Sequence, residues 1–277
     1  MLLGWAKFAE SNGFALAMIS DQIALAPEVQ ALYPVPFYDP FTTIAWLAAN
    51  TSELRLGTSV LVLPYRHPLQ TARIGANLDA LSNGRFVLGV GSGWSKQEYD
   101  ALGVPFDRRG AVTDEYLTAI IDAWSNDISS SSGPYAPYDE IHTGPRPVPA
   151  PPIWVGGASR AAIRRAVRHG DAWHPINPRP HWLRDKGLPV LRSMAAEAGV
   201  AVPALCPRIR AHPTATTLGD DDRVLGEGTI DQIRADLDHL AELGAEYVVL
   251  DTYIGPAERR TAEEDWRILE TVAGLAI

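Results

Sequence analysis

Apolar residues along this chain gather into short runs that are separated by longer segments with helical periodicity. Several of the runs end in glycine, serine or another small residue, which is typical of strands that finish at a turn. Strands are therefore predicted at residues 14–20, 54–60, 85–91, 152–156, 171–174, 204–211 and 246–251.

The segments between these strands carry apolar residues three and four positions apart, as amphipathic helices do. Helices are predicted at residues 2–12, 40–50, 71–81, 108–124, 160–168, 182–198 and 229–243. Gly13 follows the first of them and is suited to end it in a left-handed conformation. The alternation indicates an α/β protein with a parallel sheet that is covered on both faces.

The length of 277 residues suits one barrel of alternating strands and helices, which needs about 250 residues. Residues 125–151 interrupt the alternation because they are rich in serine and proline. A linker between two domains is the alternative interpretation, but neither half alone has enough strands to close a core. We therefore predict a single domain, residues 1–277, with residues 125–151 as a long connection.

Charge and cysteine content exclude several functions. A net charge of -9 argues against a sequence-independent nucleic-acid binder. The single Cys206 cannot form an internal disulfide, and no apolar run reaches the length of a membrane span or a secretory signal, so we expect a cytoplasmic protein with no membrane partner. The histidines lack metal-ligand spacing, and the acids at 220–222 lack the calcium-loop pattern, so no metal is expected.

Candidate chemistry lies at the carboxyl ends of the predicted strands, because the loops there build the active sites of such barrels. The segments that meet this condition are Ser20-Asp21-Gln22, Thr58-Ser59-Val60, Gly91-Ser92-Gly93-Trp94, Gly156-Gly157-Ala158-Ser159 and Trp173-His174. Glycines in such places let a flat ring or a phosphate approach the backbone. The alternative interpretation is that each glycine completes a tight turn.

The segment from Gly156 to Ser159 is the strongest candidate for an anion site. It joins a predicted strand directly to a predicted helix, so free backbone N–H groups and the positive end of the helix dipole face an anion there. Ser159 also suits an ordinary N-cap, and the two roles are compatible. Arg160 and Arg164 are placed to add positive charge, although arginines on a helix surface are usually just solvated.

Three motifs together resemble the bacterial luciferase-like superfamily of flavin and deazaflavin (coenzyme F420) oxidoreductases. They are Gly57-Thr58-Ser59-Val60, Pro64-Tyr65-Arg66-His67-Pro68 and Gly89-Val90-Gly91-Ser92-Gly93-Trp94. Similarity runs from Ser20-Asp21 to Leu243-Gly244 and is strongest to probable F420-dependent oxidoreductases. The resemblance implies a (β/α)8 TIM barrel that apparently lacks its first strand, because the chain opens in a helix. Either the start lies upstream or the barrel is shortened.

The resemblance also implies a set of cofactor-binding residues and a non-prolyl cis peptide between Ser59 and Val60. The implied cofactor residues are Ser59, Val60, Gly91, Ser92, Gly93, Trp94, Gln97, Gly156, Gly157, Ala158 and Ser159. The F420-dependent branch usually has histidine where this chain has Gln22, and an amide cannot titrate. Asp21, Gln22 and Glu98 are therefore the candidate catalytic residues.

The function that the resemblance implies is hydride transfer between coenzyme F420 and a small organic substrate. An FMN-dependent monooxygenase of the same fold is the first alternative. A non-catalytic flavin-binding or assembly protein is the second, because of Gln22 and the missing strand. Family members are commonly oligomers, and exposed aromatic residues near Trp46, Tyr65 and Trp124 would suit the interface of a homodimer or larger homo-oligomer.

Overall fold

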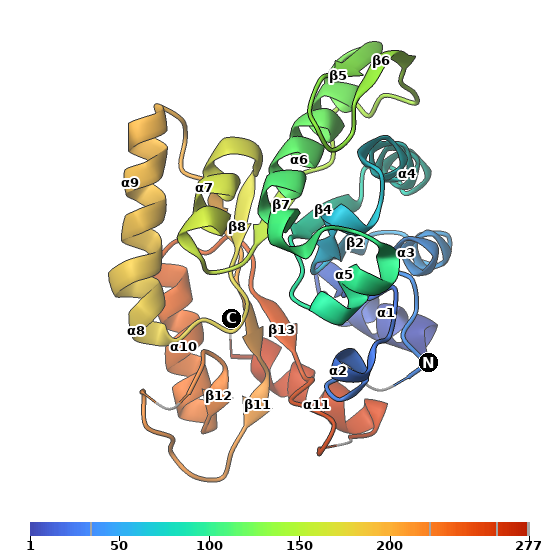
Figure 1. Cartoon of the computed structure of the whole chain (residues 1–277). Helices are drawn as coiled ribbons and strands as arrows, with labels where there is room; N and C mark the ends of the chain where they lie inside the picture. Colours follow the sequence, from blue (N-terminus) through green and yellow to red (C-terminus); the bar gives the residue numbers. More distant parts are fainter. Residues whose placement is uncertain (34, 222, 259, 276–277) are drawn as a thin grey trace. The chain divides into compact units, whose positions relative to one another are not determined.

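The computed structural model describes residues 1–33, 35–221, 223–258 and 260–275, so Asp222 of the acidic turn lies outside the described residues. Contacts divide the chain into two compact units, Leu2–Ile153 and Trp154–Ile277, the latter together with Met1. Figure 1 shows the order of the helices and strands along the chain. Each unit is built from parallel strands that alternate with helices.

The first unit contains the parallel strands β1, β2 and β4, which are neighbours in that order, while the short β3 pairs with the end of β4. Every residue of β4 is buried. The elements are α1 (Leu2–Ser11), β1 (Leu16–Ile19), α2 (Pro27–Gln30), α3 (Pro40–Ala48), β2 (Arg55–Thr58), β3 (Leu61–Val62), α4 (Pro68–Leu81), β4 (Phe86–Gly91), α5 (Lys96–Leu102), α6 (Arg109–Ser125), β5 (Ile128–Ser131) and β6 (Tyr138–His142).

The second unit contains the parallel strands β7, β8 and β9 and two further parallel pairs, β10 with β13 and β11 with β12. A π-helical stretch, Leu183–Gly187, joins α8 to α9. The elements are β7 (Ile153–Gly156), α7 (Arg160–His169), β8 (Ala172–His174), α8 (Pro180–Trp182), α9 (Leu188–Ala198), β9 (Ala204–Leu205), β10 (Arg208–Arg210), β11 (His212–Pro213), β12 (Glu227–Gly228), α10 (Ile230–Glu242), β13 (Val249–Asp251) and α11 (Ala262–Ala273).

The predicted strands and helices are confirmed, with shifted ends. Gly13 is left-handed, with φ of 75°. The predicted strand at 204–211 is divided into β9 and β10, and Pro207 between them has no backbone N–H for a continuous ladder. The predicted helix at 71–81 begins earlier, because Pro68 suits its first turn and the His67 side chain accepts a hydrogen bond from the Leu69 amide.

The serine- and proline-rich connection contains two strands that were not among the predicted strands. It forms the antiparallel hairpin of β5 and β6, which extends from the end of α6 in Figure 1. Ser129 Oγ lies 2.9 Å from the Tyr138 hydroxyl and donates to Asp122 Oδ2 at 2.5 Å. Hydrogen bonds between side chains therefore support this hairpin where apolar alternation is absent.

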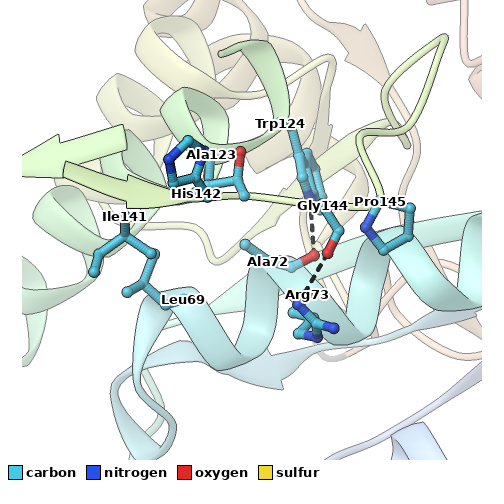
Figure 2. A pocket seen from close by; sticks show the side chains of 10 residues that line it. Leu69, Ala72, Arg73, Ala123, Trp124, Ile141, His142, Gly144 and Pro145 are labelled. Carbon is cyan, nitrogen blue, oxygen red and sulfur yellow. Dashed lines mark hydrogen bonds between the residues drawn. The ribbon is translucent and has the colours of Figure 1, made fainter. Parts of the chain in front are cut away.

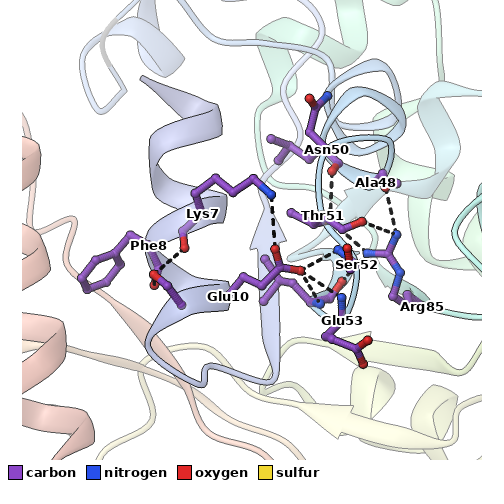
Figure 3. Close-up of polar contacts among 12 residues, drawn as sticks. Lys7, Phe8, Glu10, Ala48, Asn50, Thr51, Ser52, Glu53 and Arg85 are labelled. Atoms are coloured by element: carbon purple, nitrogen blue, oxygen red, sulfur yellow. Dashed lines mark hydrogen bonds and ion pairs between the residues drawn. The ribbon is translucent and has the colours of Figure 1, made fainter.

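The loop that leads into β2 is held from two sides, as Figure 3 shows. The Oε1 atom of Glu10 accepts hydrogen bonds from the backbone amides of residues 52, 53 and 54, at 2.6, 2.9 and 3.3 Å. Arg85 donates to the carbonyl oxygen of Leu54 in this loop at 2.7 Å and to that of Ala48, the last residue of α3, at 2.9 Å. These amide hydrogen bonds lower the pKa of Glu10 from 4.5 to about 2, and those from Glu53 and Ser52 have the largest effects.

The substitution Glu10→Gln is expected to lower the free energy of unfolding by about 1–2 kcal/mol at pH 7, because hydrogen bonds to a carboxylate become hydrogen bonds to an amide. The carboxylate has a lower pKa in the folded state, so its contribution is present above pH 4.5 and is lost as the pH falls toward 2. Urea unfolding of the wild type and the variant between pH 3 and 7 measures this. The exposed Glu53 provides the control substitution Glu53→Gln, and an equal loss there would contradict the prediction.

Candidate active site

The side chain of Asp21 is buried just beyond β1 and is held by an ion pair. Arg66 donates to Oδ2 at 2.6 Å and to Oδ1 at 2.9 Å, and the Val62 amide donates to Oδ2 at 2.9 Å. Arg66 also donates to Asp39 at 3.0 Å. Burial raises the pKa of Asp21, and the Arg66 guanidinium opposes that shift. Both carboxylate oxygens of Asp21 are thus engaged in fixing Arg66.

Glu98 is fully buried at the start of α5 and holds the loop after β1. Its Oε1 accepts hydrogen bonds from the backbone amides of Ile23 and Ala24, at 2.5 and 2.7 Å, and its Oε2 accepts one from the Tyr65 hydroxyl at 3.0 Å. Burial raises the pKa of Glu98. Burial and the Glu98 carboxylate also raise the pKa of Tyr65, so the phenol stays protonated as the donor.

In the sequence, Gln22 lies between Asp21 and Ile23, and the amide of Ile23 is bound by Glu98. Ser20, two positions earlier, donates from its hydroxyl to the carbonyl of Ser59 at 3.1 Å, so the loop is attached to β2 as well. Within the described residues, the buried Oε1 atom of Gln22 accepts no hydrogen bond. A buried acceptor without a partner is unfavourable, and a donor on a bound molecule would remove that penalty.

The glycines at the end of β4 are required for packing inside the first unit. A Cβ atom on Gly91 would lie 2.6 Å from Val60 Cγ2, and one on Gly93 would lie 2.6 Å from Val62 Cγ1. The peptide bond between Ser59 and Val60 is cis, which confirms what the family resemblance implied. Close packing therefore accounts for Gly91. Gly93 combines close packing with a left-handed φ of 66°, as a glycine that completes a turn does.

The remaining cofactor-binding candidates of the first unit follow β4. Ser92 accepts a hydrogen bond at its carbonyl from the Tyr99 hydroxyl at 2.6 Å, and the Trp94 side chain is exposed. The Gln97 amide donates to Glu28 Oε1 at 2.9 Å. The structure thus gathers Asp21, Gln22, Ser59, Val60, Gly91 and the residues that follow it at the carboxyl ends of β1, β2 and β4.

The predicted anion segment lies in the second unit, between β7 and α7. Gly157 has φ of 106°, and the indole of Trp173 donates to its carbonyl at 2.8 Å. Ser159 is the N-cap of α7, and its Oγ accepts from the Ala162 amide at 3.1 Å. The first turn of α7 carries no acidic side chain, so the positive end of the helix dipole is not neutralised within the helix.

His174, at the end of β8, is a buried structural group. Its Nδ1 lies 2.5 Å from the carbonyl oxygen of Cys206, and burial lowers its pKa to about 4. The imidazole is therefore neutral at pH 7, with Nδ1 as the donor to that carbonyl.

Three residues near the candidate site were not among the predicted site residues. Arg66 and Tyr65 belong to a motif that carried the family resemblance, so that motif was the signal for them. Glu28, which accepts from the Ser95 hydroxyl at 2.5 Å and from the Gln97 amide, had no sequence signal because its partners lie far along the chain.

A small pocket of about 110 Å³ lies elsewhere in the first unit, between α4, α6 and the segment after β6 (Figure 2). Arg73 donates to the Gly144 carbonyl at 3.0 Å at this pocket. Trp124 was predicted to be exposed, but only 4% of it is, and its indole donates to the Ala72 carbonyl at 2.9 Å. Packing of α6 against α4 covers it, so it is no candidate for a subunit interface.

No cluster of three or more His, Cys, Asp or Glu side chains in the described ranges is arranged to hold a metal ion. None of the helices among the residues that the structure describes is long and apolar enough to cross a bilayer.

Comparison with known proteins adds a family and several similar folds. The model of the luciferase-like monooxygenase family matches residues 2–222. An uncharacterized protein of Mycobacterium tuberculosis is 33% identical over 210 residues, which are 72% of this chain and 72% of the relative.

Two solved structures show the similarity of the fold. An F420-dependent secondary alcohol dehydrogenase in complex with an F420-acetone adduct has a TM-score of 0.83 at 16% identity, over 99% of this chain and 94% of that chain. The oxygenating constituent of 3,6-diketocamphane monooxygenase from Pseudomonas putida, a type II Baeyer-Villiger monooxygenase in complex with FMN, has a TM-score of 0.75 at 18% identity, over 98% of this chain and 90% of that chain.

Proposed function

Since this chain belongs to the luciferase-like monooxygenase family, we propose that it is an F420-dependent oxidoreductase that transfers a hydride between the deazaflavin and a small organic substrate. Its fold class is the α/β TIM barrel of luciferase-like type. The family contains both F420-dependent and FMN-dependent proteins of similar fold. The choice of F420 is carried by the motifs Gly57-Thr58-Ser59-Val60 and Pro64-Tyr65-Arg66-His67-Pro68, which resemble the F420-dependent branch most. The fold similarity supports either cofactor, because an F420-dependent tetrahydromethanopterin reductase and the FMN-binding monooxygenase both have a TM-score of 0.75.

The residues at the start of α7 fit the phosphate of such a cofactor. The segment Gly156 to Ser159 offers backbone N–H groups at a helix N-terminus, and no acidic side chain of the first turn competes for them. Gly157 has a backbone conformation that other residues rarely adopt, and the Trp173 indole fixes its carbonyl. We assign Gly156, Gly157, Ala158 and Ser159 to phosphate binding.

A second assignment concerns the carboxyl ends of β1, β2 and β4. Ser59, Val60, Gly91, Ser92, Gly93, Trp94 and Gln97 are assigned to the ring of the cofactor, which supplies the hydride when it is bound. Gln22 is assigned the role of an uncharged hydrogen-bond acceptor, because its buried Oε1 has no partner in the described part of the chain. Asp21 and Glu98 then act by positioning the loop that carries Gln22, since their oxygens bind Arg66, Tyr65 and backbone amides.

The single domain of residues 1–277, the cytoplasmic location and the homo-oligomer stay predictions, as does the identity of the substrate. An FMN-dependent monooxygenase is the second candidate, favoured by the similarity to the FMN-binding enzyme. Titration of the purified chain with F420 and with FMN, followed by cofactor fluorescence, separates the two candidates. Saturable binding of F420 in preference to FMN is expected, and preference for FMN would replace the proposal with the monooxygenase.

A further inference from the structure

One face of α7 carries three exposed arginines. Arg160, Arg164 and Arg168 are spaced four residues apart and are exposed, whereas the opposite face, with Ile163 and Ala166, is buried. No hydrogen bond or ion pair of these three guanidinium groups occurs within the described ranges. We call these three residues the arginine face.

The arginine face is unfavourable for the helix alone. Some other exposed arginines, such as Arg184 and Arg234, lie beside an acidic side chain, whereas these three do not within the described ranges. Like charges four residues apart on a helix repel, and Arg160 stands in the first turn, where the helix dipole disfavours a cation. A bound polyanion would relieve both effects.

The geometry of the helix relates the arginine face to the segment that we assign to phosphate. Side chains on an α-helix lean toward its N-terminus, so Arg164 and Arg168 lean toward the Gly156–Ser159 end of α7. Residues four apart are separated by about 6 Å along the axis. The positive charges therefore form a row that begins beside the phosphate segment and continues along the helix.

We propose that the arginine face of α7 binds the oligoglutamate tail of coenzyme F420. This inference rests on the proposed function. The F420 molecule continues beyond its phosphate as a lactyl group and a chain of γ-linked glutamates, each of which adds a free carboxylate, whereas FMN ends at its phosphate. The carboxylates follow the phosphate along the cofactor, as the arginines follow the phosphate segment along α7. The tail and the arginine face are therefore complementary in charge and in sequence along the helix.

The test compares F420 that carries several glutamates with the same deazaflavin phosphate without glutamates, by fluorescence titration of the wild-type chain. The longer form is expected to bind on the order of tenfold more tightly, because each exposed ion pair contributes up to about a factor of five. The gain should shrink when the ionic strength is raised from 0.05 to 0.5 M. Arg160 stays unchanged in all variants, because it adjoins the phosphate segment.

The variant Arg164→Glu/Arg168→Glu should lose the gain from the glutamates while it still binds the form without them. Arg192 is an exposed arginine of α9 in the same unit. The control Arg192→Glu reverses a charge away from the arginine face and should keep the gain. Thermal unfolding of each variant shows whether it is folded.

Two results would overturn the inference while the proposed function stands: equal affinity of the wild type for the two forms, or a gain that survives in the double variant. Failure of both deazaflavin forms to bind the folded wild type would overturn the proposed function, and the inference with it.

Discussion

Replacing Arg66 by methionine is expected to lower the free energy of unfolding by about 3–5 kcal/mol, because the substitution leaves the carboxylate of Asp21 buried without its partner. Asp21 is 2% exposed and binds Arg66 through both carboxylate oxygens. Burial opposes the charge on Arg66, but the hydrogen bonds and the charge of Asp21 raise its pKa. Urea unfolding followed by circular dichroism measures the effect.

Two further variants show whether the effect belongs to the buried pair. Asp21→Asn combined with Arg66→Met should recover part of the loss, since no buried charge is then left unpaired. Lys96→Met removes an exposed ion pair with Asp100, in which the two side chains are 62% and 59% exposed, and should change stability little. Comparable losses for Arg66→Met and Lys96→Met would contradict the description of Asp21 and Arg66 as a buried ion pair.

Replacing Gly89 by alanine is expected to lower the free energy of unfolding by about 3 kcal/mol or more, at the upper end of the usual cost of overpacking. A Cβ atom at Gly89 would lie 1.8 Å from the carbonyl oxygen of Thr58, and backbone cannot rotate away as a side chain can. Thr58 also donates from its hydroxyl to the Gly89 carbonyl at 2.6 Å. The added methyl group must therefore separate β2 from β4, directly before Ser59.

Gly274→Ala is the matched control for this substitution. Gly274 has φ of -64°, and its new Cβ atom would lie 3.2 Å from the Glu270 carbonyl, a contact that a small shift relieves. The control should unfold near the wild-type midpoint. A Gly89→Ala protein that unfolds at the same denaturant concentration as the control would show that β2 and β4 are not packed as described.

Much of the fold could be predicted because its strands and helices have local signals. The fully apolar run of β4 predicted a strand, and the small residues after β2 and β4 indicated candidate chemistry at the carboxyl ends of these strands. Helix α11 was not among the predicted helices although Thr261 and Glu264 form a capping box, which is a local signal that could have found it. The hairpin of β5 and β6 lacked such a signal, because polar side chains stabilise it.

The candidate site was less predictable because its contacts join distant parts of the sequence. Asp21 was predicted as a catalytic candidate, but its partner Arg66 lies 45 residues away, and nothing local shows the pairing. Glu98 likewise binds amides of Ile23 and Ala24, some 75 residues earlier. The sequence indicated the edge of the sheet where these groups meet. The positioning roles of Asp21 and Glu98 could be assigned only from their hydrogen bonds in the structure.

The titration of the wild-type chain with F420 and with FMN tests the central claim most directly. The account predicts saturable binding of F420 that is clearly tighter than that of FMN, measured by cofactor fluorescence under the same buffer conditions. Tighter binding of FMN, or no saturable binding of F420 to the folded protein, would contradict it.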